Sequence, residues 1–377
     1  MPRSENGGVI GARNGTSINN ATGMFSLKNH FVANLFGEWP RSGNIFVGLG
    51  SSATPYIAIY PFSTLGFGSK FSDPASLPPG ACRSFRFNST GKAVAVGHAS
   101  SPYISAYPWS GSGFGTKYSN PATLPGAATG YGVSFGPNGD FIVVGSSATL
   151  VGYPWSDSSG FGTKYSDPSS LPTGSIGDTD VYQTYVAVAH GTNTYIGVYN
   201  IDAITGWGAK FSNPATLPAG TGNGIRFRSD GSAVAIAHAT SPCITVYPWS
   251  GAGYGTKYNN PGTLPAGEGQ QADFSPAGNS IVLANNDLSG GANYVTAYQW
   301  DNSTGFGTKY SNPSSGLPNT GNGVKFYPNG NYVFFAHTSS PAITGYNWTY
   351  SGGFGTKLTQ PGTLPGGSGY KVDITII

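Results

Sequence analysis

Short apolar segments separated by Gly- and Asn-rich turns recur along most of this chain. Within residues 130–171, an alternating segment (131–135) is followed by a GPNGD turn, a wholly apolar run (141–145), a β-rich segment (150–155) and a last segment at 161–166. Alternation predicts a half-buried strand, and a short continuous apolar run predicts a strand buried on both faces. We therefore predict four strands, a to d, and no helical periodicity interrupts them.

This stretch is one unit of a repeat, which is marked by a phrase that reads Gly-aromatic-Gly, then Lys, then a Pro-rich end. Its seven copies begin at Gly66, Gly113, Gly160, Gly206, Gly253, Gly305 and Gly353, at spacings of 47, 47, 46, 47, 52 and 48 residues. Four strands per unit, repeated seven times, predict an all-β fold, a seven-bladed β-propeller of four-stranded antiparallel blades. The pattern V-x-F-x-P-x-G at 133–139 and 324–330 resembles WD-type repeats, although Tyr-Pro-Trp replaces the Trp-Asp pair.

The two ends of the repeat region fit one shared blade. Residues 370–377 match strand a, whereas residues 44–50 and 55–62 match strands b and c. We expect the C-terminal strand to pair with the N-terminal strands, because this closes the ring and removes exposed sheet edges. The chain would then consist of an N-terminal arm, 1–42, and a propeller, 43–377.

Composition narrows the function classes. The 377 residues include 59 Gly and 28 Pro, as many tight turns require, but only 9% are charged and the formal net charge is +3. Lys and Arg form no run, so we expect no nucleic-acid partner. No apolar stretch of about 18 residues occurs, so we expect no membrane insertion. Cys82 and Cys243 occupy different repeat positions and are expected to be unpaired core residues.

Sequence signatures of catalysis are missing. The chain has only 15 carboxylates, no two of them stand out as the acid and base of a glycosidase, and no G-x-S-x-G, H-E-x-x-H or P-loop motif occurs. We therefore expect a protein that is not an enzyme and that uses no metal and no cofactor.

Four histidines share one repeat position just after strand b: His98, His190, His238 and His337. Their recurrence makes them candidate binding residues, as a ring of ligand-binding or pH-sensitive groups. Equivalent points of neighbouring blades should lie about 10 Å apart or more, too far for one shared metal ion. The alternative that the sequence favours is structural: each side chain would fix the turn between strands b and c by hydrogen bonding to the backbone.

Two further repeated positions allow a similar choice. The Tyr of the Tyr-Pro-Trp segment is aromatic in every copy, which favours packing between blades over a sugar-stacking platform. The Lys of the phrase is expected to cover apolar surface with its stem while its ammonium group meets solvent.

The arm, residues 1–42, lies outside the repeat. A polar Gly- and Asn-rich stretch is followed by a short predicted amphipathic helix, with Ser26 as its cap and Leu27, Phe31 and Leu35 as its apolar stripe. Together with two flanking aromatic residues, these three residues are the candidate anchoring residues: Phe25, Leu27, Phe31, Leu35 and Trp39. The arm would either dock on another chain or pack against its own propeller.

Part of the arm resembles a segment near the N-terminus of tail-fibre and other virion proteins of marine tailed phages. The similarity rests on Ala-Thr-Gly-Met-Phe-Ser-Leu at 21–27 and on Gly-x-Trp-Pro at 37–40. It implies a structural or adhesin role in a virion that is assembled in the host cytoplasm, with the arm bound to other virion proteins and no cofactor.

These features lead to one main hypothesis. The chain is expected to be a non-enzymatic virion structural protein, a tail-associated fibre or adhesin, whose propeller binds a host-surface glycan or protein, or neighbouring virion subunits including further copies of itself. A capsid decoration protein, a WD-like protein-binding scaffold and a carbohydrate-binding propeller are the alternatives.

Overall fold

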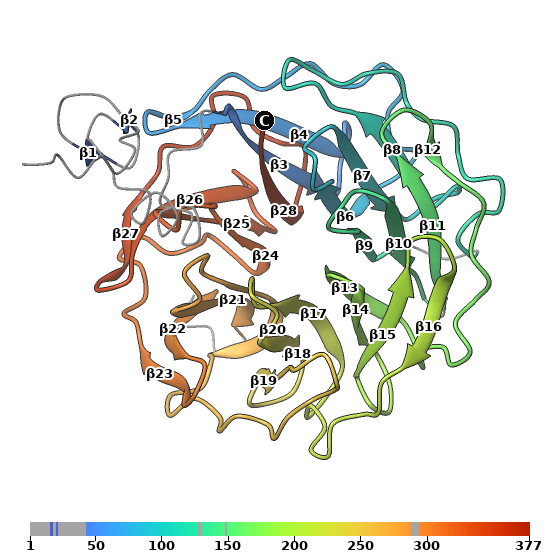
Figure 1. Cartoon of the computed structure of the whole chain (residues 1–377). Helices are drawn as coiled ribbons and strands as arrows, with labels where there is room; N and C mark the ends of the chain where they lie inside the picture. Colours follow the sequence, from blue (N-terminus) through green and yellow to red (C-terminus); the bar gives the residue numbers. More distant parts are fainter. Residues whose placement is uncertain (1–15, 18–19, 22–42, 127–129, 148, 288–293) are drawn as a thin grey trace, which may run out of the picture.

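The computed structural model describes residues 16–17, 20–21, 43–126, 130–147, 149–287 and 294–377. Seven antiparallel sheets stand around a central axis like the blades of a wheel, with strand a of each sheet innermost (Figure 1). The described residues contain no helix. The fold is therefore the all-β, seven-bladed propeller that the repeat predicts. The predicted helix of the arm lies outside the described residues.

Among the described residues, five blades have four strands each. Blade 1 comprises β28 (Gly369–Ile376), β3 (Ile45–Ser51), β4 (Ile57–Ser63) and β5 (Gly66–Phe67). Blade 3 comprises β9 (Gly132–Phe135), β10 (Phe141–Gly145), β11 (Leu150–Ser156) and β12 (Gly160–Phe161). Blade 4 comprises β13 (Ile176–Tyr182), β14 (Tyr185–His190), β15 (Ile196–Asp202) and β16 (Gly206–Lys210). Blade 6 comprises β20 (Gly267–Phe274), β21 (Ser280–Asp287), β22 (Val295–Asp301) and β23 (Gly305–Lys309). Blade 7 comprises β24 (Gly321–Phe326), β25 (Tyr332–His337), β26 (Ile343–Thr349) and β27 (Gly353–Lys357).

The other two blades have three strands and a single bridge in place of strand d. Blade 2 comprises β6 (Cys82–Phe87), β7 (Ala93–His98) and β8 (Ile104–Pro108), with a bridge from Trp109 to Phe114. Blade 5 comprises β17 (Gly222–Phe227), β18 (Ala233–His238) and β19 (Ile244–Pro248), with a bridge from Trp249 to Tyr254. Separately, β1 (Thr16–Ser17) pairs with β2 (Asn20–Ala21).

The length of strand d depends on the residue that follows the Tyr of strand c. Strand d has five residues in the blades where an amide residue follows it: Asn200, Gln299 and Asn347. It is two residues or one bridge in the blades where proline follows it: Pro61, Pro108, Pro154 and Pro248. The proline carbonyl still accepts a hydrogen bond from strand d, but its nitrogen has no hydrogen to donate back. The strand expected at 161–166 is therefore wrong beyond Phe161.

The ring is closed by the two ends of the repeat region, as predicted. The last strand, β28, pairs with β3 from Gly369 opposite Ser51 to Ile376 opposite Ile45. Asn44 and Ile377 extend this ladder, because each donates its backbone N–H to the other's carbonyl at 2.7 and 3.0 Å. The inner strand of the closing blade is therefore hydrogen-bonded to its neighbour along its whole length.

The same ladder defines two faces of the wheel. Gly369 and Ser51 lie at the face where the strands a begin, which we call the mouth face. Asn44 and Ile377 lie at the other end of the strands, on the opposite face. A strand of eight residues rises roughly 25 Å, which separates the two faces.

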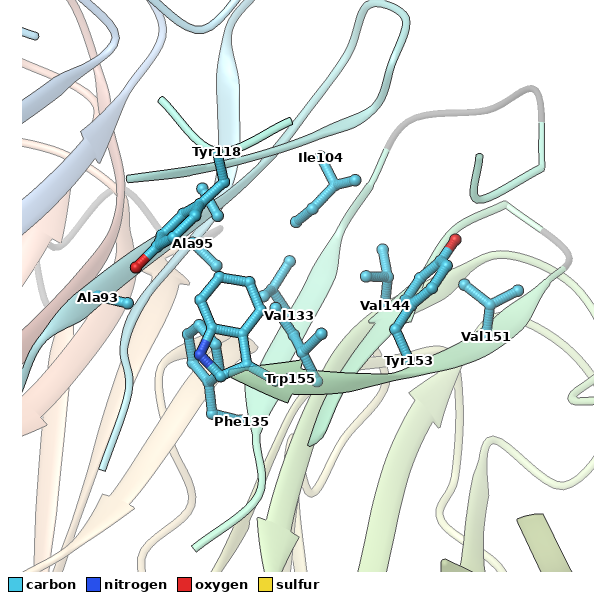
Figure 2. Packing of buried hydrophobic residues seen from close by; sticks show 12 residues of the cluster. Ala93, Ala95, Ile104, Tyr118, Val133, Phe135, Val144, Val151, Tyr153 and Trp155 are labelled. Carbon is cyan, nitrogen blue, oxygen red and sulfur yellow. The ribbon is translucent and has the colours of Figure 1, made fainter. Parts of the chain in front are cut away.

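The core of the described chain consists of seven apolar clusters, each shared by two adjacent blades. The cluster in Figure 2 joins Ala93, Ala95 and Ile104 of blade 2 to Val133 and Trp155 of blade 3. Trp155 meets three rings edge-on, with centroids 5.0–5.1 Å apart: Tyr118, Phe135 and Phe161. Such pairs add about 0.5–1.5 kcal/mol each beyond burial. Because every cluster belongs to two blades, no blade has a core of its own.

Candidate functional site

The first residues of strand a are irregular in six blades. A β-bulge places one extra residue there, for example between Cys82 and Ser84 of blade 2. A bulge leaves the extra residue unpaired, re-aims its side chain and is common beside functional sites. With Tyr131 at the equivalent point of blade 3, these residues are Arg83, Tyr131, Gly177, Asn223, Gln270, Asn322 and Tyr370. We call these seven positions the channel-mouth ring.

The channel-mouth ring surrounds a pocket at the axis of the propeller. The pocket has a volume of about 290 Å³ and is lined by all seven ring residues, by Lys371 and by the segments around Ile176, Gly191 and Thr221. Small-ligand sites typically measure ~300–1,000 Å³, so this pocket suits a small ligand. Among the described residues that line it, none is a carboxylate or a histidine.

The residue type at the channel-mouth ring changes from blade to blade, although other positions of the repeat are constant. All seven copies keep the Gly of the phrase and the Tyr of strand c, yet the ring contains one Arg, one Gln, one Gly, two Asn and two Tyr. Variation on a rigid scaffold is typical of recognition surfaces. Sequence reasoning missed the ring, although one signal was available: in six copies it lies at the same distance from the phrase Gly while its residue type changes.

Beneath the ring, polar side chains of strand a fill the channel. The fully buried Asp178 is contacted from three other blades: by Lys371 Nζ at 3.2 Å, by Gln271 Nε2 at 3.0 Å and by Arg86 Nη2 at 3.8 Å. Burial by itself would raise the pKa of Asp178, but the charges of Lys371, Arg86 and Arg226 hold this pKa below its ordinary value. These contacts place a charged network directly beneath the pocket, because Lys371 belongs both to the network and to the pocket lining.

A second polar layer lies two residues further along the strands. Arg226 Nη1 lies 2.7 Å from Asp180 Oδ1, and Asp273 Oδ1 lies 3.5 Å from Arg226 Nε and 3.8 Å from Lys325 Nζ. Three carboxylates of this layer each accept a backbone N–H from the next blade at 2.8–2.9 Å: Asp180 from Phe227, Asp273 from Phe326 and Asp373 from Phe87. The carboxylates of this layer are therefore held by cations or backbone N–H groups of adjacent blades.

The four repeated histidines lie inside four different blades. Each is the last residue of its strand b, and at most 1% of its surface is exposed. In three blades Nε2 lies 2.9–3.0 Å from a hydroxyl of strand c: His98 to Ser105, His238 to Thr245 and His337 to Thr344. His190 instead has Nδ1 3.0 Å from the carbonyl of Thr173.

In three of the four blades the histidine therefore contacts a side-chain hydroxyl of strand c, and not the backbone as expected. Burial lowers the pKa of His98, His238 and His337 to about 4, so these rings are neutral at ordinary pH. This geometry gives the histidines a structural role, and the binding role predicted from their recurrence stays a prediction.

The other repeated positions also serve the scaffold. The strand-c tyrosines are at most 1% exposed and pack between blades, as expected. Five of them donate to a carbonyl of the preceding phrase, as Tyr153 does to Thr123 at 2.8 Å. In six of the seven copies the ammonium group of the phrase Lys binds a side chain three residues later, as Lys210 binds Asn213 at 2.8 Å, so, contrary to expectation, it does not meet solvent alone.

Several other predictions concern the arm and the ligand classes. The candidate anchoring residues Phe25, Leu27, Phe31, Leu35 and Trp39 lie outside the described residues. Cys82 and Cys243 are buried and unpaired, as expected. Within the described ranges, no three His, Cys, Asp or Glu side chains gather in an arrangement that could hold a metal ion. The same part of the chain has no helix with the length and apolarity that crossing a membrane requires.

No model of a known protein family matches the chain, and no curated protein matches it. Solved structures do. The periplasmic gluconolactonase of Pseudomonas aeruginosa is 16% identical, with a TM-score of 0.65 over 88% of this chain and 98% of that chain. A proposed 6-phosphogluconolactonase of Bacteroides fragilis is 14% identical, with a TM-score of 0.66 over 89% and 98%. The Cps50 (Swd1) propeller domain of Myceliophteria thermophila is 12% identical, with a TM-score of 0.52 over 75% and 87%. At these identities the likeness shows the fold alone, a WD-like seven-bladed propeller.

Proposed function

We propose that this chain is a non-enzymatic recognition protein that binds its ligand at the mouth of the central channel and is carried by a virion as part of a tail fibre or adhesin. The observation that supports recognition is the channel-mouth ring, in which seven blades place differing side chains around one pocket. The observation that supports a virion is the resemblance of residues 21–40 to the N-terminal segments of phage structural proteins.

The position of Asn44 agrees with an anchoring arm. Asn44 lies on the face opposite the channel mouth, so the propeller begins at that face. A propeller that is attached through its arm can thus present the pocket away from the attachment point. This arrangement suits the binding of host-surface molecules.

Some similar structures carry the names of lactonases, and hydrolysis of a lactone is the competing function. Its chemistry needs a general base that is active near neutral pH. Among the described residues that line the pocket there is no histidine and no carboxylate, the side chains that most often serve as general bases. The Lys371 ammonium is also held by Asp178. Binding therefore fits the pocket better than catalysis.

The virion role is tested by purifying phage particles from a host that produces the full chain and searching them by mass spectrometry. We expect the full chain in the particles, and we expect a variant that lacks residues 1–42 to fold but to be missing from them. A full chain that never enters particles would overturn the virion role. Equal incorporation of the shortened variant would overturn the arm as the anchor.

The absence of catalysis is tested separately. The full chain is incubated with gluconolactone and with 6-phosphogluconolactone, and we expect hydrolysis at the uncatalysed rate. Faster hydrolysis that is lost in Lys371→Met would overturn the non-enzymatic assignment.

A further inference from the structure

The charges inside the channel balance one another. The two layers beneath the channel-mouth ring contain four cations and four carboxylates: Lys371, Arg86, Arg226 and Lys325 against Asp178, Asp180, Asp273 and Asp373. Buried charges are tolerated when they are paired in this way. The layers therefore give the pocket above them no net charge.

The remaining charge at the mouth is Arg83. Its guanidinium lies over the ring of Tyr370, with Cζ 4.3 Å from the ring centroid. Its buried Nε has no hydrogen-bond partner, and none of the described carboxylates forms an ion pair with it. Stacking on an aromatic ring fixes the plane of a guanidinium but leaves its hydrogen-bonding edge free. Arg83 is thus one oriented positive charge without a counterion, at the edge of a pocket that no described carboxylate lines.

The other polar ring residues are neutral, and two of them are fixed in place. Asn223 and Asn322 donate from Nδ2 to the carbonyls of Gly269 and Gly369, at 2.9 and 2.7 Å. Each amide has its nitrogen bound to the next blade, so its oxygen remains as an acceptor. Tyr131 and Gln270 add a hydroxyl and a third amide to the lining. Such groups suit the hydroxyls of a polyhydroxylated ligand.

We propose that the channel mouth binds a sugar residue that carries one carboxylate, such as a uronic acid of a bacterial surface polysaccharide. The carboxylate would pair with the guanidinium of Arg83, whose fork matches two carboxylate oxygens. The sugar hydroxyls would meet the amides of the ring and Tyr131. One uncompensated positive charge matches a monoanion, whereas a phosphate monoester carries nearly two negative charges at neutral pH. This assignment rests on the recognition function proposed above and names its ligand class.

The test uses the full chain and three soluble probes in titration calorimetry: methyl glucuronoside, methyl glucoside and glucose 6-phosphate. We expect binding of the glucuronoside, binding of the neutral glucoside weaker by about 10- to 100-fold, and affinity that falls with added salt. Arg83→Gln should lower the affinity for the glucuronoside to that for the glucoside. Arg83→Lys should restore part of it, because lysine keeps the charge without the fork.

Lys92→Gln is the matched control, since it removes one exposed positive charge beside the turn between β6 and β7, on the opposite face. We expect it to leave binding unchanged, and thermal melting of each variant should show that the wheel remains folded. Equal affinity for the glucuronoside and the glucoside, preference for the phosphate, or an Arg83→Gln variant that binds normally would overturn the carboxylate assignment.

Binding to host cells separates this assignment from the proposed function. If the full chain binds the cells but free glucuronoside does not compete, the ligand class is wrong and recognition still stands. If the chain binds neither cells nor sugars, both are overturned.

Discussion

The apolar clusters between blades and the polar wall of the channel are made by neighbouring residues of the same strands, yet they follow opposite rules. On β24, Val324 packs into a cluster between blades, while the next residue, Lys325, faces the channel and approaches Asp273. Alternate residues of a strand point to opposite sides, so each strand a contributes to both regions. The clusters use nearly the same residues in every blade, whereas the side chains that face the channel change in type and charge from blade to blade.

This difference shows how a repeat can carry a unique site. A cluster residue must fit a neighbour that is nearly identical from blade to blade, which restricts its type. A channel residue contacts residues of several blades at once. Its type is therefore restricted only by the balance of charges and hydrogen bonds around the axis. The positions that stay constant in the repeat therefore specify the propeller fold, and the positions that vary between blades specify the candidate site.

The largest expected effect comes from breaking the charge balance of the channel. Asp178→Ala leaves Lys371 and Arg86 buried without their shared carboxylate, so we expect the free energy of unfolding to fall by about 3–5 kcal/mol. Guanidinium-induced unfolding followed by tryptophan fluorescence measures it. The double variant Asp178→Ala with Lys371→Met removes both charges and should recover much of the loss. If Asp178→Ala alone lowers the free energy of unfolding by less than ~1 kcal/mol, the charge balance of the channel contributes little to stability.

Acid should weaken the blades through their histidines. Burial sets the pKa of His98, His238 and His337 to about 4, below the ordinary value of 6.5. The unfolded chain therefore binds more protons between these values, and stability is full above pH 6.5 and is lost as pH falls toward 4. Each histidine contributes at most about 3 kcal/mol to this loss.

A natural replacement provides the control for this acid effect. In blade 6, Asn285 occupies the histidine position and accepts a hydrogen bond from Thr296 at 3.2 Å. We expect His238→Asn to make the melting temperature less dependent on pH between 6.5 and 4, with little change at pH 8. A variant whose pH profile matches that of the unmodified chain would show that His238 is not responsible.

A smaller effect distinguishes bonded from unbonded tyrosines in the clusters. Tyr247→Phe removes the hydroxyl that donates to Thr216 at 2.7 Å and leaves that carbonyl unpaired, so unfolding should become easier by about 0.5–1.5 kcal/mol. Tyr107→Phe is the matched variant, because the buried Tyr107 hydroxyl has no partner, and it should be neutral or stabilising. Chemical unfolding of both variants measures the difference. Equal losses would mean that the hydrogen bond to the phrase is unimportant.

The smallest effect concerns the outer strand. Pro248→Asn gives blade 5 the backbone donor that blades 4, 6 and 7 have, so strand d should lengthen there with a change in stability of less than about 1 kcal/mol. Hydrogen exchange of residues 254–257 reports it, and we expect slower exchange in the variant. Unchanged exchange would show that proline does not limit this strand.

The wheel could be predicted from the sequence because each of its rules recurs seven times. The period, the strand pattern and the match of residues 370–377 to strand a were sufficient for the blade count and the closure, both confirmed. Strand d of blade 3 ends earlier than its sequence pattern predicts, because Pro154 of strand c has no N–H to donate to it.

The candidate site could not be predicted in the same way. A bulge is a backbone feature without a fixed residue type, so the residue types of Arg83 and Gln270 do not mark them, and only their equal distance from the phrase Gly relates them. The contact of Gln271 with Asp178 joins residues 93 positions apart and exists only because the ring closes. A site whose residues meet around the axis can be predicted only after the closure of the ring has been predicted.

The closing ladder also has a mechanical consequence. The first strand after the arm, β3, lies between β28 and β4 and is hydrogen-bonded to both. A pull on the arm along the strand direction loads these two ladders in shear, so many hydrogen bonds must break together and not one after another. A force applied through the chain before Asn44 therefore acts on the strand that closes the ring, which is held on both sides.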